Sequence, residues 1–254
     1  PCGLGGIIRS SNLDDIDPKN LLVGQNITTE NGVWEKRPGT SKWNATAISG
    51  TPQIIGVYDF LKQNGTRLFI ACTSDGKIYQ ETAGPAFTTF IKSALGTNVR
   101  YAFEVFNDEL YVCNGFDIVQ TWDGVASATA NITTPPTDWS GNNQPIAIIG
   151  HNNRLWGFGN SNQPNIAYYS IVENGKNFTG TGSGTLAIGN KSKIVGGKII
   201  QGWLYLFKND GSIFRINNDS PTPSQWYIEQ ILDASSEGLI GLANQRLIVE
   251  AGGN

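Results

Sequence analysis

The fold is decided by a stretch that recurs five times along the chain, first as NGTRLFIACTSDGKIYQ at residues 64–80. Each copy has a polar turn and then a leucine, which an aromatic residue follows in the first four copies. The other copies are NDELYVCNGFDIVQTWDG, NNRLWGFGNSNQPNIAYYS, QGWLYLFKNDGSIFRI and NQRLIVEAGGN, and the repeated leucines are Leu68, Leu110, Leu155, Leu204 and Leu247. These leucines lie 42 to 49 residues apart. This period is typical of the four-stranded blades of a β-propeller.

Each repeat contains the parts of one antiparallel sheet. A short apolar strand precedes the turn, as in QIIGVYDF, RYAFEVF, PIAIIG, KIVGGKII and GLIGLA. The leucine strand comes next, and then a second turn, which is Asp-Gly at residues 75–76 and 210–211, a pair that tight hairpins favour. A third strand and a more polar fourth strand complete the unit; the expected fourth strands are FTTFIK, SATANIT, NFTG and QWYIEQI. Apolar residues alternate mostly with period two, which predicts an all-β chain.

The last repeat contains only the first two strands before Asn254. Near the other end, NGVWEK at residues 31–36 has the pattern of a third strand, and TSKWNAT at residues 40–46 can follow as a fourth. We therefore expect a five-bladed β-propeller closed by N-terminal outer strands that join C-terminal inner strands, a device that leaves no open sheet edge. The expected closing blade combines residues 32–47 with 237–254, and residues 1–31 form an extended arm. The other blades are expected at residues 52–96, 99–136, 144–182 and 193–233.

Composition and charge narrow the class of protein. Only 15% of the 254 residues are charged and 39% are hydrophobic, so a highly charged disordered chain is excluded. The net charge of −3 argues against a surface that grips nucleic acid throughout. Cys72 and Cys113 lie in apolar strands and are expected to be buried thiols. A single histidine and three scattered cysteines do not match a zinc site, so we expect no metal and no cofactor.

A hydrolase would need two carboxylates that converge on the central channel, where the first strands lie. Those strands supply only Asp59, Glu104 and Glu237. Asp59 and Glu104 are in adjacent repeats, so a catalytic pair is an alternative, but structural carboxylates are the favoured interpretation. His151 lies at a turn with no nucleophile motif nearby. We expect a protein that is not an enzyme.

The seven tryptophans offer the best candidates for a recognition surface. Trp156 and Trp203 fall in second strands and are expected in the core. The others fall in third or outer strands or near loops, where an exposed ring could contact sugars or protein: Trp34, Trp43, Trp122, Trp139 and Trp226. A core position is still the favoured interpretation for each of them.

The N-terminal region carries a distinctive pattern. Leu22 precedes GQNI at residues 24–27, and ENGVWEKRPG follows at residues 30–39. This pattern resembles the opening of propeller-containing virion proteins of tailed bacteriophages, in the neck or tail, where an extended arm precedes the blades. Tail nozzle proteins of short-tailed phages are usually much longer than this chain, so the position in the particle stays open between nozzle, neck, hub and decoration.

The resemblance implies a structural protein of the virion, assembled in the cytoplasm of the host bacterium. Its implied partners are other virion proteins such as portal, adaptor or tail subunits, in several copies around a symmetric ring, with no membrane contact and at most indirect contact with DNA. The residues expected at that interface are Ile7, Ile8, Arg9, Leu13, Trp34 and Arg37. The alternative is a carbohydrate-binding, lectin-like propeller or a host-receptor-binding module, with one sugar site at each blade interface.

Overall fold

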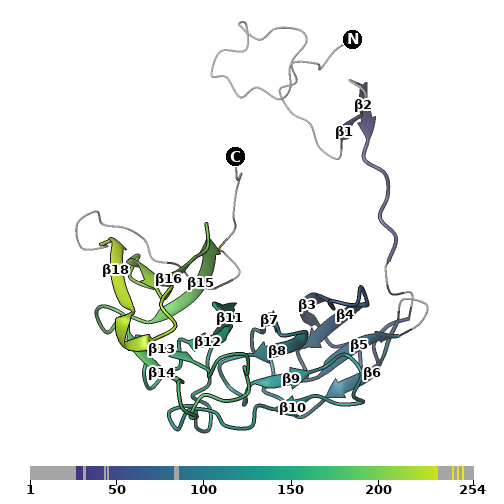
Figure 1. Cartoon of the computed structure of the whole chain (residues 1–254). Coiled ribbons are helices and arrows are strands. Elements are labelled where there is room, and N and C mark those ends of the chain that lie inside the picture. Colours follow the sequence, from purple (N-terminus) through teal and green to yellow (C-terminus); the bar gives the residue numbers. More distant parts are fainter. Residues whose placement is uncertain are drawn as a thin grey trace, which may run out of the picture. The chain divides into compact units, whose positions relative to one another are not determined.

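The computed structural model describes residues 27–30, 33–42, 44, 46–82, 86–233, 242, 245 and 248. The chain divides into two compact units, Pro1–Trp43 and Asn44–Asn254 (Figure 1). In the first unit, β1 (Ile27–Glu30) and β2 (Val33–Lys36) form an antiparallel hairpin. The strand expected over NGVWEK is therefore present, and its partner is β1. The pairing expected for it with residues 237–254 falls almost entirely outside the described residues.

The second unit is all-β, with four antiparallel sheets of four strands each that resemble propeller blades. Every sheet follows chain order from its first strand to its fourth (Figure 1). The first sheet contains β3 (Ile54–Leu61), β4 (Arg67–Thr73), β5 (Ile78–Thr82) and β6 (Ala86–Lys92), and the second contains β7 (Ala102–Phe106), β8 (Glu109–Cys113), β9 (Gln120–Trp122) and β10 (Ala130–Asn131). The third contains β11 (Ala147–His151), β12 (Arg154–Phe158), β13 (Ile166–Tyr169) and β14 (Gly184–Ala187), and the fourth contains β15 (Ile194–Ile200), β16 (Trp203–Lys208), β17 (Ile213–Asn217) and β18 (Tyr227–Leu232).

The turns between first and second strands explain the polar residues at the start of each repeat. Asn107 and Asp108 have φ of 49° and 61°, and Asn152 and Asn153 have φ of 46° and 55°. Two successive left-handed residues define the tight turn whose twist matches that of a hairpin, and asparagine and aspartate tolerate this conformation best after glycine. The expected hairpins are confirmed at both positions.

The repeated leucines lie in the core between successive sheets. Leu110 packs in the cluster shared by the first and second sheets, Leu155 in the cluster shared by the second and third, and Leu204 in the cluster shared by the third and fourth. Each of the three is fully buried. Each therefore faces the sheet that precedes its own. The burial expected for Cys72 and Cys113 is also confirmed.

Leu68 departs from this pattern, because it packs toward the second sheet, which follows its own. Phe69, on the opposite face of β4, occupies the position that the other repeats give to leucine. The reason is the turn, which is longer here and closes with a hydrogen bond from Lys62 N to Thr66 O at 2.8 Å. A shift of one residue moves a strand's side chains to the other face of its sheet. The alignment of the first repeat on Leu68 is therefore wrong by one residue.

The fourth strand expected at NFTG is also wrong. The Asn177 side chain accepts hydrogen bonds from the backbone N–H groups of Thr179 and Gly180, at 3.1 and 2.8 Å, so these residues form a turn. This is the local bonding by which asparagine competes with strand pairing. The third sheet instead takes β14 as its fourth strand and continues to Ala187.

Candidate functional site

Most of the expected interface residues lie outside the residues that the structure describes. Ile7, Ile8, Arg9 and Leu13 lie outside the described residues. Trp34 lies in β2 opposite Thr29, and only its backbone is described. Arg37 follows β2 directly and is exposed. The expected interface at these six residues therefore stays a prediction.

The two carboxylates considered for a hydrolase face different ways. Asp59 lies opposite Phe69, on the face of the first sheet that is turned away from the second sheet. Arg67 Nε donates to both Asp59 oxygens at 2.8 Å, and this hydrogen bonding lowers the pKa of Asp59. Glu104 faces the third sheet, where its Oε1 accepts a hydrogen bond from Gly150 N at 2.8 Å. Burial raises the pKa of Glu104 to about 7. Because the side chains extend from opposite faces of neighbouring sheets, they do not form a catalytic pair.

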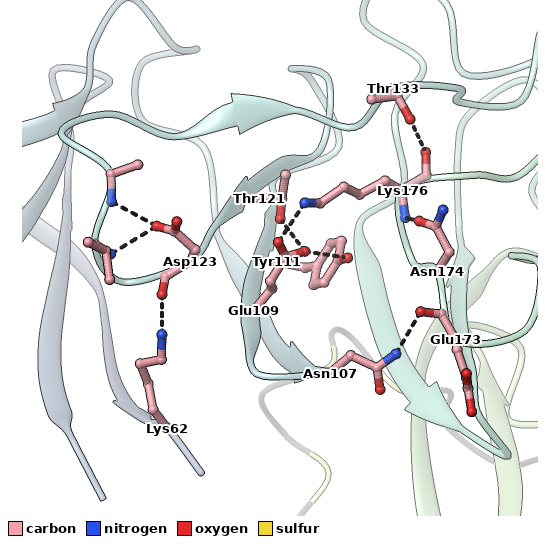
Figure 2. Close-up of polar contacts among 12 residues, drawn as sticks. Lys62, Asn107, Glu109, Tyr111, Thr121, Asp123, Thr133, Glu173, Asn174 and Lys176 are labelled. Carbon is pink, nitrogen blue, oxygen red and sulfur yellow. Dashed lines mark hydrogen bonds and ion pairs between the residues drawn. The ribbon is translucent and has the colours of Figure 1, made fainter. Parts of the chain in front are cut away.

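Polar side chains at the sheet boundaries tie successive sheets together (Figure 2). Lys62 Nζ donates to Asp123 O of the second sheet at 2.5 Å. Between the second and third sheets, Asn107 Nδ2 donates to Glu173 O at 2.7 Å, and Lys176 Nζ pairs with Glu109 Oε1 at 2.5 Å. These contacts supplement the apolar clusters and orient each sheet against the next.

The first sheet presents an apolar face on the side away from the second sheet. Cross-strand pairing places Val57, Leu61, Phe69, Tyr79 and Phe90 on this face. Val57 is 61% exposed, Leu61 59% and Phe90 48%. Exposed apolar side chains that gather on one sheet face mark a surface meant to be covered.

The fourth sheet presents a mixed face on the side away from the third sheet, where Lys198, Arg215 and Glu229 lie in one row with Tyr205. Leu204 and Leu206 face the third sheet, so Tyr205 and Phe207, which alternate with them along β16, lie on the opposite face, where they are half-buried. Trp203 is on the same side, with the Arg215 guanidinium 4.9 Å from its ring centroid. Trp203, expected in the core, is therefore half-buried at the surface of the described part of the chain.

Gln245 connects the C-terminal region to this fourth sheet. Its Oε1 accepts a hydrogen bond from Gly197 N at 2.6 Å, and its Nε2 donates to Gly197 O at 2.7 Å. Gln245 also lines a cavity of about 430 Å³ with Val57, Tyr58 and Phe103. One side chain thus contacts β15 and faces β3 and β7.

A second cavity, of about 400 Å³, lies between the third and fourth sheets. Asn152 and Arg154 contribute from the third sheet, and Asn218, Asp219, Ser220 and Trp226 from the fourth. Asn218 Oδ1 bonds His151 Nε2 at 2.9 Å and accepts from Asn152 Nδ2 at 3.2 Å. Burial lowers the pKa of His151. This cavity combines an aromatic ring with a buried cation and amide groups, as small-molecule sites do.

Sequence reasoning singled out Trp226 as one of five possible surface tryptophans, and the structure leaves it half-buried at this cavity. Trp122 and Trp139 are buried, as the core interpretation expected. Sequence reasoning missed Arg154 and Asn218, which are 64 residues apart in the chain. Only the contact between two sheets brings them together, so no local pattern could have found them.

Within the described ranges, no group of histidine, cysteine, aspartate and glutamate side chains could hold a metal ion. None of the helices found among these residues is long and apolar enough to cross a membrane.

Comparison with known proteins gives structural likeness only. No protein-family model matches the chain, and no curated protein matches it. Two similar solved structures are crystal structures of BBS1N in complex with ARL6DN, one soaked with lead and one with mercury. They are 10% and 14% identical to this chain, with TM-scores of 0.39 and 0.43 over 65% and 67% of it. The chain spans about half the length of each, 52% and 53%.

Proposed function

We propose that this chain is a structural protein of a tailed-bacteriophage virion, a propeller module of the neck or tail that makes protein–protein contacts in assembly. The observation that carries the proposal is the resemblance of GQNI at residues 24–27 and ENGVWEKRPG at residues 30–39 to the opening of such proteins. We assign it no catalytic role, no cofactor and no membrane contact. Its place is the virion, assembled in the host cytoplasm, with portal, adaptor or tail subunits as neighbours.

We further propose that the propeller has five blades and closes with residues 32–47 and 237–254. Two sheet faces support closure, one at each end of the series of four sheets, because both carry aromatic or aliphatic side chains that a fifth sheet would cover. Gln245, from the expected closing blade, bonds β15 and lines a cavity with β3. The Cβ of a side chain at Gly196, on the same face as Phe207, would lie 2.6 Å from Ile248 Cδ1, so C-terminal residues already lie against that face. Leu242, Gln245 and Ile248, the residues described in this segment, are not in strands.

The N-terminal arm is the part that we expect to bind neighbouring subunits. An extended segment adds buried area to an interface without changing the body that carries it. Ile7, Ile8 and Leu13 would supply the apolar contacts, and Arg9 and Arg37 the charged ones. Residues 35–42 are exposed, so Arg37 is accessible within its own unit.

The test is incorporation into particles. The intact chain should cofractionate with purified virions, and a variant that lacks residues 1–24 should fold, with an unchanged melting transition, yet be absent from particles. Normal incorporation of the folded truncated variant would overturn the role of the arm. Absence of the intact chain from virions would overturn the proposed function.

A further inference from the structure

The cavity between the third and fourth sheets has the features of a ligand site, a role that lies beyond assembly. Its volume of about 400 Å³ falls in the range of small-molecule pockets, roughly 300–1,000 Å³. Trp226 forms an aromatic part of its wall, and Trp226 Nε1 donates to Ser220 O at 2.6 Å. This bond and the packing of the ring against Tyr169, with ring centroids 4.9 Å apart, fix the indole plane.

The buried cation of the cavity has no acidic partner. Arg154 is 4% exposed, and its Nη1 donates to the carbonyl oxygens of Ser170 and Gly182, each at 2.6 Å. No acidic side chain of the described part lies within ion-pair distance of it, and no hydrogen bond from its Nε or Nη2 forms there. The rings of Tyr169 and Trp226, each with its centroid 5.4 Å from the guanidinium carbon, stabilise this charge, and a carboxylate is the group that the planar fork of arginine binds best.

The residue equivalent to Arg154 in the preceding repeat has the ion-pair partner that Arg154 lacks. Arg154 begins β12 opposite His151, and Glu109 begins β8 opposite Phe106, so the two occupy the same place in successive sheets. Glu109 is ion-paired across its sheet boundary with Lys176 (Figure 2). At the next boundary the charge is reversed to Arg154, and the carboxylate that the fourth sheet contributes to the cavity, Asp219, is exposed and forms no ion pair with it.

A donor beneath the cavity is also unsatisfied. Asn218 is 2% exposed and lines the cavity, and its Nδ2 has no hydrogen-bond partner. Its amide orientation follows from Asn152, because Asn152 Nδ2 donates to the Asn218 Oδ1. A buried donor without an acceptor is costly, so an acceptor that reaches it would be stabilised here.

We propose that this cavity binds an acidic saccharide, a pyranose that carries a carboxylate. The carboxylate would meet Arg154, ring or acyl oxygens would accept from Asn218, and the apolar face of the sugar would lie against Trp226. Sugars suit the site because one face of the ring is apolar while its edges carry hydrogen-bonding groups, and the cavity offers both surfaces. Asp219 is exposed at the rim of the cavity, so it disfavours a ligand that carries a second negative charge besides its carboxylate.

Titration calorimetry with glucuronic acid and N-acetylneuraminic acid tests the inference, with glucose as the uncharged probe. We expect saturable binding of an acidic sugar and at least tenfold weaker binding of glucose. Arg154→Lys, which keeps the charge and loses the fork, should weaken binding about tenfold, and Asp219→Asn should strengthen it.

Asn152→Ala and Asn107→Ala form a matched pair, because the two asparagines occupy the same turn in successive repeats and each bonds the next sheet. Only Asn152 lines the cavity, so Asn152→Ala should weaken binding at least fivefold and Asn107→Ala less than twofold. Equal weakening by both, equal binding of glucose, or the absence of saturable binding to either acidic sugar would overturn the inference. These outcomes do not depend on incorporation into virions, so the two proposals fail separately.

Discussion

At the scale of single residues, burial and close backbone approach explain positions that composition leaves unremarkable. Glu104 is half-buried, and its carboxyl group accepts a hydrogen bond from Gly150 N. Burial raises its pKa from 4.5 to about 7, and the hydrogen bond from Gly150 and the charge of Lys198 reduce that rise. Folding therefore favours the protonated form of Glu104.

This shift predicts how stability depends on pH. Between about pH 4.5 and 7, the folded protein holds a proton on Glu104 that the unfolded chain releases. Stability contributed by this group is therefore present at low pH and is lost as pH rises through this window. Glu104→Gln keeps an acceptor for Gly150 and cannot ionise. The free energy of unfolding of this variant, minus that of the wild type, should therefore rise by up to roughly 3 kcal/mol between pH 5 and pH 8. A difference that stays constant with pH, measured by urea denaturation, would contradict this.

A turn can require glycine for its left-handed backbone conformation alone, or also because a Cβ atom would collide with a neighbouring residue. Gly65 and Gly76 both have positive φ, 85° and 75°. A Cβ at Gly65 would meet nothing within 4 Å, whereas at Gly76 it would lie 2.1 Å from Leu95 O. Gly65→Ala should cost about 1–2 kcal/mol of stability from the left-handed conformation. Gly76→Ala should cost clearly more, because the backbone at Leu95 has to move; equal midpoints in denaturant would argue against that close approach.

At the scale of strands and sheets, the repeat in the sequence predicts the four sheets well, because burial on both faces enforces a regular pattern of apolar residues. Two details failed for local reasons. The long turn after β3 shifted the first repeat by one residue, and the turn around Asn177 replaced an expected strand. The cavity at Arg154 was not predictable, because its residues come from different sheets and no periodicity records such a contact.

Sheet boundaries should differ from sheet surfaces in the strength of their ion pairs. Glu109 and Lys176 join two sheets, whereas Asp75 and Lys77 pair within a single turn of the first sheet. A double-mutant cycle with Glu109→Gln and Lys176→Met should give a coupling of about 0.5–1 kcal/mol. The same cycle on Asp75 and Lys77 should give less and should vanish at high salt. Equal coupling energies for the two pairs would mean that a position at a sheet boundary does not strengthen an ion pair.

At the scale of the whole molecule, closure of the propeller depends on what covers the outer faces of the first and fourth sheets. The face with Val57 and Leu61 belongs to the first sheet, and the face with Tyr205 and Phe207 belongs to the fourth. Residues 237–254 and the strand β2 carry the expected closing pattern. A lone two-stranded hairpin is marginally stable in water, so β1 and β2 alone would not hold their hydrogen bonds for long.

Hydrogen exchange at the amides of Val33–Lys36 tests closure most directly, compared between the intact chain and a variant that lacks residues 237–254. Closure predicts that these amides are protected in the intact chain and exchange like those of an unstructured peptide in the variant. Protection that is the same in both chains would show that the strand does not depend on the C-terminal residues, and would contradict the five-bladed ring.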